Sequence, residues 1–276
     1  MKLPVGKPRL RERRLAEAWD RDASLRHFEL TTRHDNAYYI LIERIALLYE
    51  HQVTIGARIL DVGCGLGVLA FYLAEQHHTV TGIDISRVSI AQAQSDFGAS
   101  ATFRVANVVR LPGDLLRCFD VVVASMIWHN HPNLNALVAG CRAALKNGGF
   151  IIATVAEPKS YLIKQGVRHK YDTPRRFEFP LRHAYCCGTH TPVPYYHRPI
   201  DLYLETLRRN RFVDIDIASD ALMGESSRND VVTFVGSAAA GYDTPRERSK
   251  QSDQRRQAVR QSSRIVPRGS TEGAPA

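Results

Sequence analysis

The chain has no hydrophobic run long enough to cross a membrane. Its longest apolar run, residues 121–128, includes Ser125 and is far shorter than the roughly 20 apolar residues that a spanning helix needs. The first 15 residues are polar and basic, without the apolar segment of a secretory signal. The sequence therefore predicts a protein with neither a membrane span nor a secretory signal.

Cysteine is scarce and internal repeats are absent. Five cysteines in 276 residues, an odd number, do not make a disulfide framework, so we expect a reducing, cytoplasmic location. Residues 183–190 contain two histidines and two cysteines, which are zinc-ligand types. Because the cysteines are adjacent and neighbouring side chains rarely reach one ion, we predict no metal site. The lack of a repeat of 20 to 50 residues argues against solenoids and propellers.

The net charge of +9 is concentrated at the two ends of the chain. Residues 1–26 contain eight Lys or Arg and four Asp or Glu, and residues 237–276 contain the same numbers. The body between them is therefore almost neutral. Basic ends can bind RNA or anionic lipid, but a solvated tail is the commoner explanation. The charge predicts no large nucleic-acid footprint on the body.

Composition divides the chain into three parts. Residues 1–50 contain short helical patterns and are expected to form an N-terminal helical cap. Residues 51–236 are expected to form the catalytic domain, with residues 159–199 inserted as a substrate lid rich in aromatic side chains. Residues 237–276 alternate small, charged and polar types and are expected to be a disordered basic tail.

Within the catalytic domain, apolar β-branched segments alternate with segments whose apolar residues recur every three or four positions. Such alternation is typical of parallel strands joined by right-handed crossovers, with helices on both faces. The sequence therefore predicts a doubly wound α/β fold with a seven-stranded Rossmann-like sheet. The predicted strands are 58–62, 79–83, 101–105, 119–124, 150–155, 212–217 and 231–235.

A glycine-rich segment follows the first predicted strand directly. It reads Asp61-Val62-Gly63-Cys64-Gly65-Leu66-Gly67 and opens a predicted helix, so its glycines allow a sharp turn and a close ligand approach. A nicotinamide-binding loop would place its third glycine at position 68, where the chain has Val68. The spacing and the acid favour a cationic ligand without a pyrophosphate.

This segment resembles the first motif of the class I S-adenosylmethionine-dependent methyltransferases, an acidic residue followed by Gly-x-Gly-x-Gly. Asp84, at the end of the second strand, matches the family's ribose-binding acid. Asn107 stands where the family commonly has an acid that binds the adenine amino group, and its amide oxygen can accept the same hydrogen bond. Segments 36–39 and 196–203 resemble, more narrowly, the small-molecule members related to ubiquinone and menaquinone biosynthesis.

The resemblance implies S-adenosyl-L-methionine as the cofactor, held along one edge of the sheet. Tyr38 is the candidate for the sulfonium end, and a core position explains this tyrosine equally well. His129, after the fourth strand, is the candidate catalytic base, with His197 and Glu157 as further candidates; each of the three also fits a structural role. The implied cofactor-binding residues are Tyr38, Asp61, Gly63, Cys64, Gly65, Gly67, Asp84, Ile85, Asn107, Val108 and Ser125.

The first functional hypothesis is methyl transfer to O, N or C of a small aromatic or amphipathic metabolite. The reaction would be an in-line displacement, in which alignment supplies much of the acceleration. One alternative is RNA methylation assisted by the basic ends. Another is a cofactor-binding protein that does not methylate, or that uses the sulfonium for another alkyl transfer.

Overall fold

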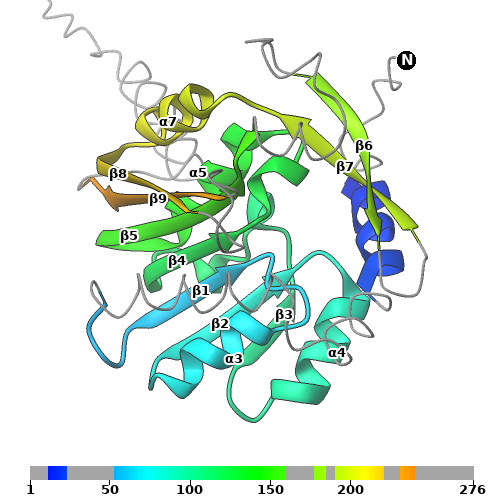
Figure 1. Ribbon diagram of the computed structural model, residues 1–276. Coiled ribbons are helices and arrows are strands. Elements are labelled where there is room, and N and C mark those ends of the chain that lie inside the picture. The colour runs from blue at the N-terminus through cyan, green and yellow to red at the C-terminus, as the bar shows by residue number, and fades with distance from the viewer. Residues whose placement is uncertain (1–11, 24–52, 159–176, 185–189, 221–230, 240–276) are drawn as a thin grey trace, which may run out of the picture. The chain divides into compact units, whose positions relative to one another are not determined.

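The fold is taken from a computed structural model, which describes residues 12–23, 53–158, 177–184, 190–220 and 231–239 (Figure 1). The chain divides into two units, residues 1–240 and 241–276. All of the second unit, and residues 24–52 of the first, lie outside the described residues. The predicted disorder of the tail therefore stays a prediction.

A seven-stranded sheet forms the centre of the first unit, in the order β3-β2-β1-β4-β5-β9-β8. Strands β1 to β5 are parallel, whereas β9 is antiparallel to both β5 and β8. The predicted seven-stranded Rossmann-like sheet is confirmed, and β9 is the one strand of this sheet that runs in the opposite direction to the other six. The strands are β1 (Arg58–Val62), β2 (Thr79–Asp84), β3 (Thr102–Val105), β4 (Phe119–Ser125), β5 (Leu145–Ala156), β8 (Phe212–Asp220) and β9 (Val231–Ala238).

Helices cover both faces of this sheet, as the doubly wound pattern requires. The helices are α3 (Val68–Glu75), α4 (Arg87–Phe97), α5 (Leu134–Ala144) and α7 (Ile200–Arg209). Successive residues of a strand point to opposite faces. Leu60 and Val122 accordingly pack in one buried cluster with α5 and α7, while Ile59 and Val121 pack in another with α3 and α4.

Strand β5 begins five residues before its predicted start at Phe150. Leu145 pairs with Phe119, and the register then shifts before Phe150 pairs with Val121. At Gly149 an added Cβ would lie 2.7 Å from the carbonyl oxygen of Asp120, so the two strands approach closely there. Gly148 and Gly149 therefore lie in an irregular part of the strand.

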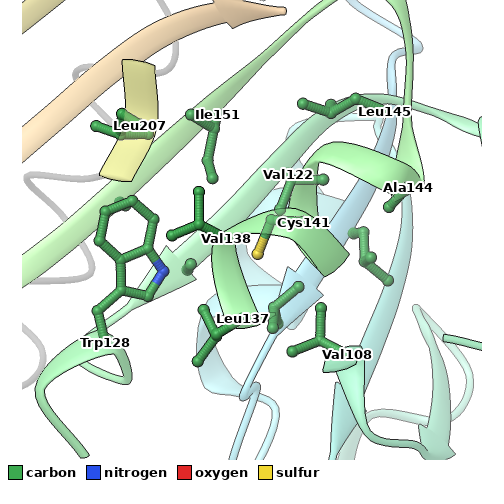
Figure 2. Packing of buried hydrophobic residues seen from close by; sticks show 14 of the residues in the cluster. Val108, Val122, Trp128, Leu137, Val138, Cys141, Ala144, Leu145, Ile151 and Leu207 are labelled. Carbon is green, nitrogen blue, oxygen red and sulfur yellow. The ribbon is translucent and has the colours of Figure 1, made fainter. Parts of the chain in front are cut away.

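The turn after β4 is anchored in the core by Trp128. Its side chain is fully buried, with ring-centroid distances of 6.1 Å to Tyr203 and 6.0 Å to Phe234. Figure 2 shows Trp128 in the same cluster as Val138 of α5 and Leu207 of α7. This packing fixes the chain directly beyond the carboxyl end of β4.

The insertion between β5 and α7 contains a hairpin of β6 (Phe177–Ala184) and β7 (His190–His197) (Figure 1). The sequence did not predict these strands, because prolines interrupt both of them. In the hairpin, Pro180 is paired with Pro194. Both strands of a two-stranded ribbon are edges, where a residue without an N–H is tolerated.

The boundary at the end of the catalytic domain also differs slightly from the prediction. Strand β9 continues through Ala238, two residues into the segment assigned to the tail.

Among the helices of the described residues, none has the length and the apolar character that a membrane span needs.

Candidate functional site

The glycine-rich segment turns sharply between β1 and α3. Gly63 has φ +73°, and an added Cβ would lie 2.4 Å from Cγ2 of Ile127. Gly67 has φ +83°, and an added Cβ there would lie 2.8 Å from the ring of Phe103. Both positions require glycine, because the backbone has a positive φ there and because neighbouring side chains leave no room for a Cβ atom. The Ile127 contact also places the turn after β4 directly against this loop.

Asp61 is a buried carboxylate at the carboxyl end of β1. It is 1% exposed, and its Oδ2 atom has no hydrogen-bond partner among the described residues. Burial, and then the charge of Asp84, raises the pKa of Asp61 to about 7. An acid in this environment favours either a proton or a ligand cation.

Asp84 lies beside the same loop, at the end of β2. Its Oδ2 atom accepts a hydrogen bond from the N–H of Gly65 (3.0 Å), and its Oδ1 atom accepts one from the N–H of Ser86 (2.8 Å). A carboxylate has about four acceptor positions, so these bonds are compatible with accepting from two further hydroxyls. The next residue, Ile85, leads directly into the cap of α4.

Cys64 is a buried residue of the same loop. It is 2% exposed, and burial raises the pKa of its thiol well above the ordinary value, with the charges of Asp61 and Asp84 adding to the shift. The side chain therefore remains an uncharged thiol. Its role in the loop is to pack.

The helix formed by residues 12–23 reaches this edge of the sheet. Ser86 caps α4 and donates from its Oγ atom to Oδ1 of Asp20 (2.7 Å). Glu12, near the other end of the helix, forms an ion pair of 2.9 Å with Arg110. Sequence reasoning missed Asp20, because nothing local distinguishes it from the other acids of the basic N-terminal segment.

The residues expected near the adenine are engaged in local structure. The Oδ1 atom of Asn107 accepts from the N–H of Val109 (3.0 Å), which caps η1 (Val108–Arg110). The Val108 side chain lies in the hydrophobic core, so the groups it can offer a ligand are those of its backbone. Ser125 shares a hydrogen bond of 3.1 Å with Thr154.

His129 lies in η3 (Trp128–Asn130), beyond the carboxyl end of β4. It is 4% exposed, and its ring centroid is 5.4 Å from that of Tyr195 in β7. His197, at the end of β7, is also buried, and burial lowers its pKa, an effect that the charge of Glu157 partly offsets. The three candidate bases thus come from the β4, β5 and β7 ends, and Tyr195 is an aromatic neighbour that sequence reasoning did not single out.

One residue and one segment that the sequence analysis considered as ligand-binding candidates lie outside the described part of the chain. Tyr38 is not among the described residues. The same holds for the side chains from His183 to His190, which include the zinc-ligand types considered above.

Comparisons with known proteins agree with this geometry. Residues 59–149 match the family model described as a methyltransferase domain. The ubiquinone biosynthesis O-methyltransferase of Pseudomonas entomophila is 30% identical over 150 residues, which are 52% of this chain and 61% of that relative. The chain therefore spans about three fifths of that relative's length.

Solved structures match over more of the chain at lower identity. A Methanosarcina mazei S-adenosylmethionine-dependent methyltransferase has a TM-score of 0.57 and 21% identity, covering 69% of this chain and 96% of its own. The Burkholderia thailandensis 1,6-didemethyltoxoflavin-N1-methyltransferase, solved with 1,6-didemethyltoxoflavin and S-adenosylhomocysteine, has a TM-score of 0.58 and 18% identity, covering 87% and 93%. Residues 59–149 thus resemble a methyltransferase domain, and the chain has the class I S-adenosylmethionine-dependent methyltransferase fold, which agrees with the resemblance found in the sequence.

Proposed function

We propose that this protein is an S-adenosylmethionine-dependent methyltransferase that acts on a small metabolite. The observation that carries the proposal is the pair of carboxylates at the ends of β1 and β2. Asp61 offers a buried oxygen that has no partner within the described part of the chain, and Asp84 borders the same glycine loop. A ligand with an ammonium group at one end and a diol at the other matches this pair.

S-adenosylmethionine fits these residues chemically. Its ammonium group would neutralise Asp61, whose burial is unfavourable for an isolated charge. Asp84 would accept from the two ribose hydroxyls, and Asn107 and the backbone at Val108 would face the adenine. Gly63, Gly65 and Gly67 let the backbone approach, while Cys64, Ile85 and Ser125 line the same strand ends. When bound, this cofactor supplies an activated methyl group on its sulfonium. Transfer of that methyl group leaves a neutral thioether.

The acceptor we propose is a hydroxyl group on an aromatic or amphipathic molecule. Support comes from the curated relative named for ubiquinone biosynthesis and from the aromatic neighbour Tyr195. His129 would hold the acceptor's proton, since a hydroxyl needs a base at neutral pH. The near-neutral body of the chain favours a small molecule over RNA, and a cytoplasmic location is part of the proposal.

The surrounding segments have a proposed role in enclosing the reaction. The helix at 12–23 and the remainder of residues 1–50, with Tyr38, would cap the cofactor, and residues 159–199 would cover the acceptor as a lid. Closure excludes water and fixes the acceptor in line with the methyl group. Residues 240–276 would be a tail that methyl transfer does not require.

The test is incubation of the full chain with methyl-labelled S-adenosylmethionine and, in parallel, protocatechuate, a metabolite extract and total RNA. Label on a small hydroxylated molecule supports the proposal. Label on RNA, lost as salt is raised, would replace it with the nucleic-acid alternative. Tight cofactor binding with no labelled product in any arm would identify a protein that binds the cofactor without methylating.

A further inference from the structure

A buried arginine connects the β7–α7 junction with the turn after β4. Arg198 is 0% exposed. Its Nη1 atom donates to the carbonyl oxygen of Trp128 (2.7 Å), and its Nη2 atom donates to that of His131 (2.6 Å). A planar guanidinium has donors in a fixed fork, which can meet carbonyls on both sides of one turn. Arg198 therefore spans η3, the turn that contains His129.

Strand β7 contacts the same turn at two further points. The side-chain amide of Asn130 donates to the carbonyl oxygen of Pro194 (2.8 Å). The ring of Tyr195 lies against that of His129. The guanidinium carbon of Arg198 lies 5.1 Å from the ring centroid of Tyr196, a distance suited to a cation–π interaction. The turn is thus held by successive residues of β7 and by the arginine that follows.

On its other side the turn touches the glycine-rich loop. Ile127 precedes Trp128 directly and fills the space where a side chain at Gly63 would stand. A displacement of the turn would therefore change both the position of His129 and the wall of the cofactor loop. Packed interiors transmit such shifts because they contain few voids.

We infer that Arg198 is a positioning residue for methyl transfer, which holds the 127–132 turn so that His129 meets the acceptor. The inference rests on the proposed function. Arg198 acts through backbone carbonyls and does not touch the reacting atoms. It also connects the insertion to the catalytic turn, since β7 and Arg198 both belong to the segment between β5 and α7.

The test compares Arg198→Lys with Arg208→Lys, a matched change at an exposed position of α7. Lysine keeps the charge but has no fork, so it cannot reproduce both carbonyl contacts. Hydrogen exchange of the full chain is measured both with and without S-adenosylhomocysteine. We expect exchange of the amides at 126–131 to rise about tenfold in Arg198→Lys, with exchange in β1 and β2 unchanged. Arg208→Lys should match the wild type throughout.

Turnover of protocatechuate gives a second readout. A misplacement of about 1 Å costs up to about a hundredfold in rate, so kcat should fall while the affinity for S-adenosylhomocysteine stays within about threefold. Wild-type exchange at 126–131 in Arg198→Lys would overturn the inference, as would an equal rise across all strands, which indicates general destabilisation. Failure of the proposed function would be seen differently, as absence of cofactor binding in the wild type, and the exchange comparison would still decide whether Arg198 holds the turn.

Discussion

The cofactor side and the acceptor side of the candidate site are assembled in different ways. On the cofactor side, Asp61, Gly63 and Gly65 stand within five positions, and Asp84 joins them through one backbone hydrogen bond. On the acceptor side, the contacts of Asn130 and Arg198 join residues 64 and 70 positions apart. The first side is a local motif on parallel strand ends, whereas the second exists only once the insertion has folded onto the turn after β4.

The largest effect on turnover should come from replacing His129, on the acceptor side. We expect His129→Asn to lower kcat by about a hundred- to a thousandfold, because the acceptor hydroxyl would lose its base. Binding of S-adenosylhomocysteine should be unchanged, since Asp61 and Asp84 lie on other strands. Labelled methyl transfer and calorimetry measure the two quantities.

The control for this change is His77→Asn, at an exposed position with φ +63° that asparagine tolerates. If His129→Asn turns over at the wild-type rate, His129 is not the base, and His197 and Glu157 remain as candidates.

The next largest effect should come from replacing Asp84, on the cofactor side, and it should be seen in cofactor affinity. Asp84→Ala removes the acceptor of the Gly65 N–H, and with it the acceptor that we propose for the two ribose hydroxyls. Loss of charged hydrogen bonds worth about 3 kcal/mol corresponds to about a hundredfold weaker binding of S-adenosylhomocysteine. Asp96→Ala, on the exposed face of α4, is the matched control. Equal affinities in calorimetry would mean that Asp84 does not hold the ribose.

Ligand binding on the cofactor side should depend on pH, because Asp61 has a pKa of about 7. Below that pH the carboxyl is protonated, and an ammonium ligand must displace the proton. Affinity for S-adenosylhomocysteine should therefore rise with pH by up to about tenfold per unit below 7 and level off above it. Asp61→Asn should abolish the slope. Isothermal titrations in two buffers of different ionisation enthalpy would count the released proton, and zero release would contradict the assignment.

Asp61 should also make folding stability depend on pH, in the direction opposite to its effect on ligand affinity. The pKa of Asp61 in the folded chain, about 7, lies above 3.8, the ordinary value of an aspartic acid side chain. The folded state therefore holds a proton that the unfolded state has lost, so stability without ligand should fall as pH rises from about 4 to about 7. Urea unfolding across this range, compared with Asp61→Asn, measures the contribution. A slope shared by both proteins would have another origin.

The smallest effect should follow deletion of residues 240–276. The proposed methyltransferase needs no tail, so kcat on a small acceptor and cofactor affinity should stay within about twofold of the full chain, which is the ordinary range of surface changes. A salt-dependent loss of activity on RNA would instead favour nucleic-acid methylation.

The sequence predicted the strands β1 and β2 and the glycine-rich loop because their signals are local. The strand before Gly63 and the acid at the end of β2 are both adjacent in the chain to the elements they define. The β6–β7 hairpin was not predicted, because Pro180 and Pro194 argue against strands unless both strands are edges. Asp20, Tyr195 and Arg198 were missed for a related reason. Each gains its role from a partner at least 66 residues away, and none carries a pattern of its own.

The most direct test of the account is a crystal structure of the full chain with S-adenosylhomocysteine. We expect the ribose hydroxyls to bind Asp84, the ammonium group to face Oδ2 of Asp61, and the sulfur to lie on the side of His129 and Tyr195. Density for the nucleoside away from residues 61–67, or with its ribose beyond hydrogen-bond distance of Asp84, would contradict it.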